Sequence, residues 1–311
     1  MRLVLKKFFA ILIISLSVMT TSCQKENQDT VVAKGAWVSV EVKTPEIATR
    51  NFGDGTMAND LYYAVYDEDG VMIGPLSKID ESRKETIHIS KTVSMNLAVG
   101  KTYSMIFWAD NVDDVCDVDF ESKTMSFDPS VANKEQYDAF WAYVKPFKVE
   151  GDISMSVNLY RPFAQLNIAA SDYDQMAEFG ADVTESQVVV KIPTSLNLVD
   201  GSVSGDKSIV YSYADIPQGE EFPVAGHKYL SMNYLLAGAE KSTIDVEFFY
   251  KSSADVECNT SFSFVPIQRN YRTNIFGALL TGSVDISIVI EPAYYEPDYN
   301  IPVVLRSKYN S

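Results

Sequence analysis

The sequence has 311 residues, of which 46% are hydrophobic and 22% charged, and its formal net charge is −16. This composition is ordinary for a folded protein and argues against extended disorder, and the length favours two domains of roughly 130 residues each. The acidity disfavours nucleic acid and anionic membrane surfaces as partners, because the long-range electrostatic field repels phosphate.

Residues 1–22 are predicted to be a lipoprotein signal peptide. A basic n-region is followed by the apolar stretch Phe8–Val18, which is too short for a permanent membrane span. The stretch ends in M-T-T-S-C, which resembles the lipobox that is cut to leave a diacylated cysteine, here Cys23. A plain secretory signal cut near Ser22 is the alternative. Loss of the three positive charges of this segment takes the formal charge from −16 to −19.

Residues 23–35 are polar and are expected to form a flexible tether. Their first four residues after the cysteine, Q-K-E-N, resemble the short charged tag that sends some lipoproteins to the outer face of the outer membrane. A solvated tether without an addressing role is the alternative. Together, the lipid on Cys23 and this tag predict a protein that is anchored in the outer membrane and exposed at the cell surface.

A half-buried strand is predicted over Ala36–Thr44, with the sequence A-W-V-S-V-E-V-K-T. Its alternation places Val38, Val40 and Val42 on one face and polar side chains on the other. The segment Pro45–Gly55 that follows is rich in turn-forming residues and is predicted to be exposed.

Further strands are predicted in the first half from alternating apolar residues. They cover Leu61–Asp67, Thr86–Ser90, Thr92–Val99, Thr102–Trp108 and Ile153–Tyr160. One short amphipathic helix is also predicted, because apolar residues recur at spacings of three and four from Tyr137 to Val144. Asn133 is its expected N-cap, and the helix should end before Pro146.

Pro162 predicts an edge, a bulge or a crossing between sheets, because proline cannot donate a hydrogen bond to a strand ladder. We therefore place a domain boundary there, with an N-terminal β-sandwich at 36–158 and a C-terminal one, including a C-terminal tail, at 159–311. The expected strands of the second half are Val188–Ile192, Lys228–Ala237, Thr243–Tyr250, Cys258–Val265, Asn274–Leu280 and Val284–Ile290. The fold class is thus all-β, with two consecutive sandwiches and one short helix in the first.

No motif for catalysis, a cofactor or a metal stands out. The two histidines, His88 and His227, lack partners at metal-ligand spacing, and no phosphate-binding glycine loop is present. Five aspartates between Asp110 and Asp119 could collect around calcium, but a solvated acidic loop is the favoured interpretation. We therefore predict that the protein is not an enzyme and holds neither cofactor nor metal.

Two further groups of residues have a structural interpretation. Cys116 and Cys258 lie in different predicted domains and are expected to stay separate, with a disulfide as the alternative. The polar segment Arg269–Asn274 is expected to bond backbone carbonyls at a turn or strand crossing, although a catalytic role is the competing interpretation.

Three segments resemble the fimbrillin superfamily of anaerobic Gram-negative bacteria. They are L-Y-Y-A-V-Y-D-E-D-G at Leu61–Gly70, L-Y-R-P-F-A-Q-L-N-I-A at Leu159–Ala169, and V-P-I-Q-R-N-Y-R-T-N-I-F-G-A-L-L-T at Val265–Thr281. The resemblance implies two transthyretin-like Greek-key sandwiches. It also implies a subunit of surface fimbriae, or pili, whose partners are other fimbrial subunits.

The same resemblance implies a way of assembly. In that superfamily an arginine-specific protease cuts after the first strand, and a strand of a neighbouring subunit fills the vacated groove. In this sequence the implied cut lies between Arg50 and Asn51, and the exchanged strand carries Ala36, Val38, Val40 and Val42. Two apolar segments near the C-terminus, Val284–Ile290 and Ile301–Leu305, are candidate donors, and neither is singled out.

A second function remains open from the sequence. The 37 aromatic residues could form surface patches that bind a host glycan or protein. The protein would then be a monomeric adhesin rather than a polymerising subunit.

Overall fold

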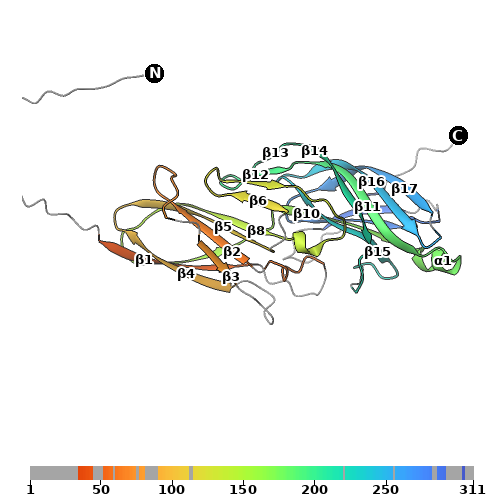
Figure 1. Ribbon diagram of the computed structural model, residues 1–311, viewed down its shortest axis with the longest axis horizontal. Coiled ribbons are helices and arrows are strands. Elements are labelled where there is room, and N and C mark those ends of the chain that lie inside the picture. Colours follow the sequence, from red (N-terminus) through yellow and green to blue (C-terminus); the bar gives the residue numbers. More distant parts are fainter. Residues whose placement is uncertain are drawn as a thin grey trace, which may run out of the picture. The chain divides into compact units, whose positions relative to one another are not determined.

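Strands make up nearly all the regular structure of the protein, as the alternating sequence predicts. The computed structural model describes residues 34–44, 52–58, 60–74, 77–80, 90–111, 115–219, 221–254, 256–281, 286–291 and 303–304. All of these residues belong to one compact unit that begins at Lys34. The all-β sandwich class predicted from the sequence is confirmed (Figure 1).

Two sheets of the first half pack around one apolar core. The first sheet has the strand order β4-β1-β9, and the second has the order β3-β2-β5-β8. Their core contains buried side chains from both sheets, such as Val40 of β1 and Phe107 of β5. The strands are β1 (Gly35–Lys43), β2 (Asp60–Tyr66), β3 (Ser77–Asp80), β4 (Ser90–Ala98), β5 (Thr102–Asp110), β8 (Phe140–Lys148) and β9 (Ile153–Asn158).

Two larger sheets form the second half. One has the order β15-β10-β18-β19-β20 and the other the order β14-β11-β16-β17. The first contains β10 (Phe163–Ala170), β15 (Lys228–Leu236), β18 (Arg272–Gly277), β19 (Ile286–Glu291) and β20 (Val303–Val304). The second contains β11 (Val183–Ile192), β14 (Lys207–Asp215), β16 (Ser242–Ser252) and β17 (Glu257–Ile267). A short helix, α1 (Tyr173–Glu178), follows β10. β10 and β14 were not among the strands predicted from the sequence.

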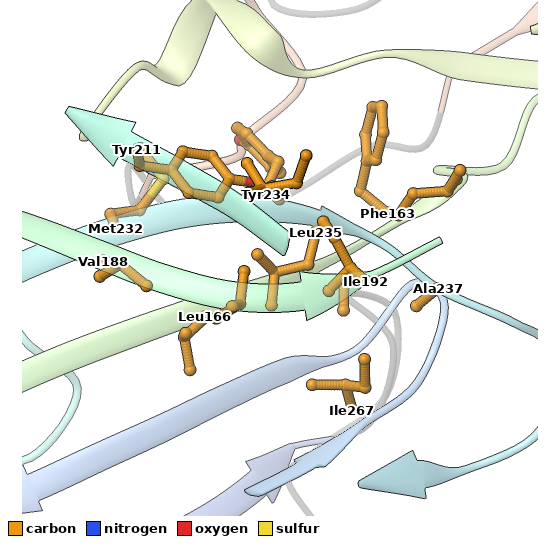
Figure 2. Packing of buried hydrophobic residues seen from close by; sticks show 14 of the residues in the cluster. Phe163, Leu166, Val188, Ile192, Tyr211, Met232, Tyr234, Leu235, Ala237 and Ile267 are labelled. Atoms are coloured by element: carbon orange, nitrogen blue, oxygen red, sulfur yellow. The ribbon is translucent and has the colours of Figure 1, made fainter. Parts of the chain in front are cut away.

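The core between these two sheets is dense. Figure 2 shows Phe163 and Leu166 of β10 beside Val188 and Ile192 of β11, with Tyr211 of β14 nearby. All five side chains are fully buried. The Tyr211 hydroxyl donates a 2.6 Å hydrogen bond to the backbone carbonyl of Tyr234, so the buried polar atom is satisfied.

A small antiparallel sheet contains strands from both sides of the predicted domain boundary. Its order is β13-β12-β7-β6, and β7 pairs with β12 in antiparallel fashion. The strands are β6 (Cys116–Asp119), β7 (Thr124–Phe127), β12 (Ser195–Asn197) and β13 (Val203–Ser204). The boundary between 158 and 159 stays a prediction.

The helix predicted between Asn133 and Pro146 is largely wrong. A single 3₁₀ turn, η1 (Glu135–Tyr137), is followed directly by strand β8. The apolar spacing misled because β8 buries both faces: Phe140 belongs to the first-half core, whereas Trp141 packs against the second-half core. Asn133 is no N-cap, because its side-chain amide bonds Ser186 and its backbone has a positive φ of 59°.

Pro146 and Pro162, the two prolines considered in the sequence, occupy irregular positions. The β5–β8 register shifts between Tyr103 and Met105, which places Pro146 at a bulge. Pro162 lies between β9 and β10, where the chain passes from one sheet to another. The prediction of a crossing at Pro162 is therefore confirmed.

Candidate functional site

The candidate site is strand β1 and the segment that follows it. β1 is the middle strand of its sheet, antiparallel to β4 along its whole length and parallel to β9 from Val38 to Lys43. Both of its backbone edges are therefore paired. Figure 1 shows β1, in red, beside β4.

The predicted inner face of β1 is buried. Val38, Val40 and Val42 are 0% exposed and Ala36 is 4% exposed. Val38 and Val40 lie between apolar residues on both neighbouring strands, Val40 for example opposite Val93 and Met155, whereas Val42 is opposite Lys91 on β4 and Val157 on β9. Burying a valine side chain stabilises a fold by roughly 1.5–3 kcal/mol, so this face holds β1 strongly in place.

The outer face of β1 is polar except at its beginning. The hydroxyls of Ser39 and Ser94 are 3.0 Å apart, and Lys43 forms an exposed ion pair with Glu41 at 2.9 Å. Trp37 is 56% exposed. Within the described part of the chain, the residues on this face are half-buried or exposed, so only the inner side of the strand contributes to a core.

Both ends of β1 are fastened to the chain around β9. The Asp152 carboxylate accepts a 2.8 Å hydrogen bond from the backbone N–H of Trp37. At the other end the N–H of Leu159 donates to the carbonyl of Lys43 at 2.7 Å. The strand therefore has a fixed register at each end.

The structure brings together Ala36, Val38, Val40 and Val42, but it does not place every predicted site residue. Cys23, Arg50 and Asn51 lie outside the described residues. The candidate lipid attachment and the candidate cut therefore stay predictions. Of the candidate donor segments, Val284–Ile290 lies mostly in β19, which pairs with β18.

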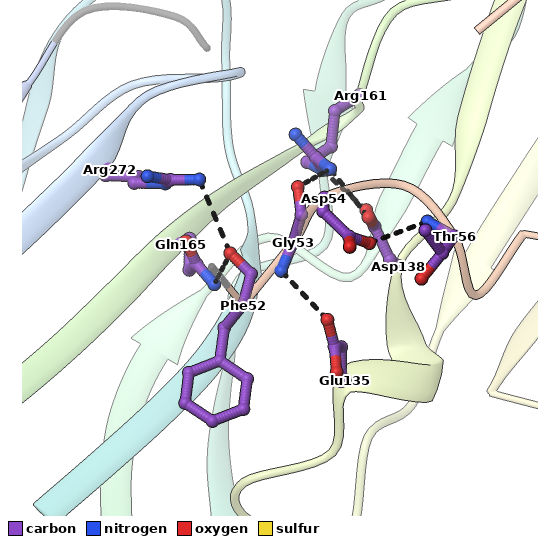
Figure 3. Close-up of polar contacts among 9 residues, drawn as sticks. All are labelled: Phe52, Gly53, Asp54, Thr56, Glu135, Asp138, Arg161, Gln165 and Arg272. Carbon is purple, nitrogen blue, oxygen red and sulfur yellow. Dashed lines mark hydrogen bonds and ion pairs between the residues drawn. The ribbon is translucent and has the colours of Figure 1, made fainter. Parts of the chain in front are cut away.

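The segment that begins at Phe52 is held by polar side chains (Figure 3). Nη2 of Arg161 donates to the carbonyl of Gly53 at 2.7 Å, and the same guanidinium forms a bidentate ion pair with Asp138. The N–H of Gly53 donates to Oε1 of Glu135 at 3.2 Å. Gly53 is therefore fixed through both of its backbone polar groups.

The preceding residue, Phe52, is held in the same way. Its carbonyl accepts hydrogen bonds from Nε2 of Gln165 at 3.1 Å and from Nη2 of Arg272 at 3.4 Å. Its ring meets the ring of Tyr229 edge-on, with centroids 5.2 Å apart. Arg161 and Gln165 come from the second of the three quoted segments and Arg272 from the third.

The ion pair between Arg161 and Asp138 is buried, with side-chain exposures of 0% and 1%. Burial raises the pKa of the Asp138 carboxyl, and the Arg161 charge partly offsets that rise. The Arg161 guanidinium also lies over the Phe140 ring, 4.7 Å from its centroid. Sequence reasoning missed these residues, and its only signal was an arginine between apolar neighbours.

The other candidates from the sequence have structural roles. Nε of Arg269 donates to the carbonyl of Ala237 at 3.1 Å, and its Nη2 donates to the carbonyl of Gly201. The predicted carbonyl-bonding role of the Arg269–Asn274 segment is thereby confirmed for Arg269, and Arg272 also bonds a carbonyl, that of Phe52. The Asn274 side chain instead accepts a hydrogen bond from the Asn167 side chain. Cys116 and Cys258 are free thiols, as expected.

Asp119 accepts two backbone N–H bonds in its own turn, from Glu121 and Ser122. Asp113, Asp114 and His88 lie outside the described residues. Within the described part of the chain, no three His, Cys, Asp or Glu side chains are arranged to hold a metal ion. None of the helices in that part has the length and apolar character needed to cross a bilayer.

These sheets define a fimbrillin-like β-sandwich fold. The tip fimbrial protein Mfa3 from Porphyromonas gingivalis, with a C-terminal truncation, matches with a TM-score of 0.51 and 10% identity over 83% of this chain and 99% of its own. A candidate adhesin from Bacteroides ovatus matches with a TM-score of 0.51 and 10% identity over 88% and 96%. Another from Bacteroides thetaiotaomicron matches with a TM-score of 0.50 and 9% identity over 83% and 97%.

The chain belongs to a family described as a family of unknown function, DUF6562, whose profile matches residues 33–306. No curated protein matches the chain. At identities of 9–10% the likeness to the solved structures concerns the fold.

Proposed function

We propose that this protein is a cell-surface fimbrial subunit, structural or accessory, that assembles by exchange of strand β1. In this proposal Cys23 carries the lipid that anchors the precursor in the outer membrane. A protease then cuts between Arg50 and Asn51, and β1 leaves together with the anchor. The single observation that carries the proposal is that β1 is a middle strand with four inward residues at 4% exposure or less.

Removal of β1 would open a slot with defined walls. β4 and β9 would each lose a paired edge, and they would stand roughly 10 Å apart, which is twice the usual strand spacing. The floor would be the apolar side chains of the facing sheet, among them Leu61, Met105 and Phe107. Exposed edges and apolar surface together favour the entry of another strand.

The slot would select its occupant by side-chain pattern. The vacated positions held one alanine and three valines on alternate residues, and their neighbours on β4 and β9 are apolar except for Lys91, which is opposite Val42. An incoming strand must therefore present small or β-branched apolar side chains at every second residue. The likeness to a tip fimbrial protein supports a fimbrial partner for this slot.

The proposal is tested by treating the purified mature chain with an arginine-specific protease. We expect cleavage after Arg50, followed by multimers that resist SDS. The matched control is Arg50→Lys, which keeps the charge but removes the specificity site. Complete cleavage at Arg50 without SDS-resistant multimers would exclude strand exchange for this chain.

A peptide of residues 35–43 tests the slot directly. We expect a fluorescent copy of this peptide to bind the cut protein and not the uncut protein, because only the cut protein has a free slot. The matched control peptide carries serine at Val38, Val40 and Val42, and it should not bind. Equal binding of the two peptides would contradict a slot lined by apolar pockets.

A second candidate function is adhesion by the uncut monomer, and one observation favours it. Phe264 on the edge strand β17 is 75% exposed and has a positive φ of 58°, which is unusual for a bulky residue. Its N–H donates to Oδ1 of Asp245, and Asp245 lines a cavity of about 900 Å³ together with Ile244 and Ile267. An exposed aromatic side chain beside a cavity lined by apolar side chains and a few polar groups is the arrangement expected of a ligand site.

Adhesion is tested by glycan-array binding with the uncleavable Arg50→Lys chain. We expect binding to fall with Phe264→Ala and to persist with Phe179→Ala, a matched control because Phe179 is 74% exposed elsewhere on the chain. Binding that is equal in both variants, or absent from both and from the parent, would argue against this function.

A further inference from the structure

The backbone of Phe52 and Gly53 is held by side chains from separate elements, which bond both carbonyls and the N–H of Gly53. We call the gripping residues the 52–53 clamp, which consists of Glu135, Arg161, Gln165 and Arg272. Glu135 belongs to η1, Arg161 to the β9–β10 crossing, Gln165 to β10 and Arg272 to β18. Figure 3 shows the four side chains converging on these two residues.

The central clamp residue is itself rigidly held. Arg161 is fully buried between the Asp138 carboxylate and the ring of Phe140. Gln165 is 1% exposed. Buried side chains that are held on several sides lose little further entropy when they bind a carbonyl, so the clamp is preorganised.

The clamp is close in sequence to the residue that bonds the end of β1. Leu159 bonds the carbonyl of Lys43, the last residue of β1, and Arg161 follows two residues later. The end of β1, at Lys43, and the clamped residue Gly53 are therefore both bonded to the crossing between β9 and β10. A cut after Arg50 would leave only Asn51 and Phe52 ahead of Gly53.

The short remainder has a limited reach. Two extended residues span about 7 Å at most, whereas β1 has nine residues and a strand of that length spans about 30 Å. Without the clamp, residues 51–59 would be long enough to reach along the slot. With it, the new chain end has to stay at one mouth of the slot.

We propose that the 52–53 clamp positions the new chain end during strand exchange. It keeps residues from 52 onward in place when β1 departs and so prevents this chain from covering its own slot. This inference rests on the proposed function, because it assumes that β1 leaves. Arg161, Gln165, Arg272 and Glu135 are positioning residues here and take no part in the cut.

The test uses the full mature chain with a recognition sequence for a site-specific protease in place of residues 45–50, so that the cut does not depend on Arg50. Hydrogen exchange is followed at the N–H of Gly53, which is bonded to Glu135, before and after the cut. Binding of the fluorescent 35–43 peptide to the cut protein is measured in parallel. The variants are Arg161→Lys and, in case that one fails to fold, Gln165→Leu.

Arg269→Lys is the matched control. Arg269 also bonds backbone carbonyls from a partly buried position, but its partners are Gly201 and Ala237 rather than residues 52 and 53. A role in general stability alone would affect both arginine variants in the same way. A positioning role predicts that only the clamp variants change the exchange at Gly53 and the peptide binding.

In the parent and in Arg269→Lys, we expect the rate of hydrogen exchange at Gly53 to change less than about threefold on cutting, because the hydrogen bonds of Gly53 remain. In the clamp variants this rate should rise by about tenfold or more on cutting. The clamp variants should also bind the peptide more slowly, since their loosened chain end competes for the slot. Loss of Gly53 protection in the cut parent, or peptide binding that is equally fast in all variants, would overturn the clamp.

The two proposals fail in different ways. If the peptide binds none of the cut proteins, assembly by strand exchange is wrong. Hydrogen exchange at the Gly53 N–H then decides by itself whether the clamp holds the cut end. If the peptide binds the cut parent but Gly53 is unprotected there, strand exchange stands and the clamp is wrong.

Discussion

Strands β1 and β10 have the same kind of neighbours but differ in how deeply they are buried. Each is flanked by an antiparallel strand on one side and a parallel strand on the other: β4 and β9 for β1, β15 and β18 for β10. β10 is buried along its whole length on both faces, whereas β1 alternates between buried and solvent-facing residues.

The difference shows which strand the fold could release. Removing β10 would expose an apolar layer on one face and, on the other, buried polar side chains such as the pair in which Nδ2 of Asn167 donates to Oδ1 of Asn274. Removing β1 would uncover only one apolar layer, because the outward serine, glutamate and lysine of β1 are already in contact with solvent. The pairing pattern is thus shared, but only β1 is built as a strand that is buried from one side.

The largest effect is expected at the crossing segment that joins the two regions. Asp138→Asn removes the carboxylate charge that pairs with the buried Arg161 guanidinium, so the free energy of unfolding should fall by about 3–5 kcal/mol. Urea unfolding of the uncut chain measures it. The double variant Asp138→Leu with Arg161→Met should recover part of the loss, and a double variant as unstable as the sum of the singles would contradict a coupled pair.

A core truncation in β10 is expected to have the next largest effect. Leu166→Ala should lower the free energy of unfolding by about 2–5 kcal/mol, because Leu166 is fully buried between two sheets. The same loss should be measured in the uncut and in the cut protein, since β10 stays in place. A loss that disappears on cutting would mean that the second-half core depends on β1.

The corresponding truncation in β1 is expected to be smaller and to depend on the cut. Val40→Ala should lower the free energy of unfolding of the uncut chain by about 1–3 kcal/mol, because two buried methyl groups are lost. In the cut protein the effect should vanish once β1 has left. A persistent effect would mean that β1 stays in its sheet after cleavage.

The smallest effect is expected on the outer face of β1. Glu41→Gln removes one side of an exposed ion pair with Lys43 and should change the free energy of unfolding by less than about 0.5 kcal/mol. Thermal melts at low and high salt check this expectation. A larger, salt-dependent loss would show that the outer face also holds β1 in place.

Local patterns in the sequence predicted the strands with clear alternation, but not β10, which is buried on both faces, or β14. The valines of β1 alternate, and a half-buried strand needs that period of two, so both its extent and its inner face were predicted. The helix at Asn133–Pro146 was predicted wrongly, because a strand between two cores has no polar face and its apolar residues also fit helical spacing.

Long-range partners could not be predicted. The parallel pairing of β1 with β9 joins residues about a hundred positions apart, such as Val38 and Ile153. The clamp joins Gly53 to Arg161, and each looks ordinary in its own stretch of sequence. Glycine in a turn and arginine before proline carry no local sign of their partner, so only the folded chain brings them together.

The mixed pairing of β1 has a consequence for direction. One wall beside β1 runs against it and the other runs along it, so a foreign strand that takes over the same hydrogen bonds must point the same way as β1 did. Every interface between subunits in a fibre would then have the same orientation, and the fibre would be polar, with two different ends.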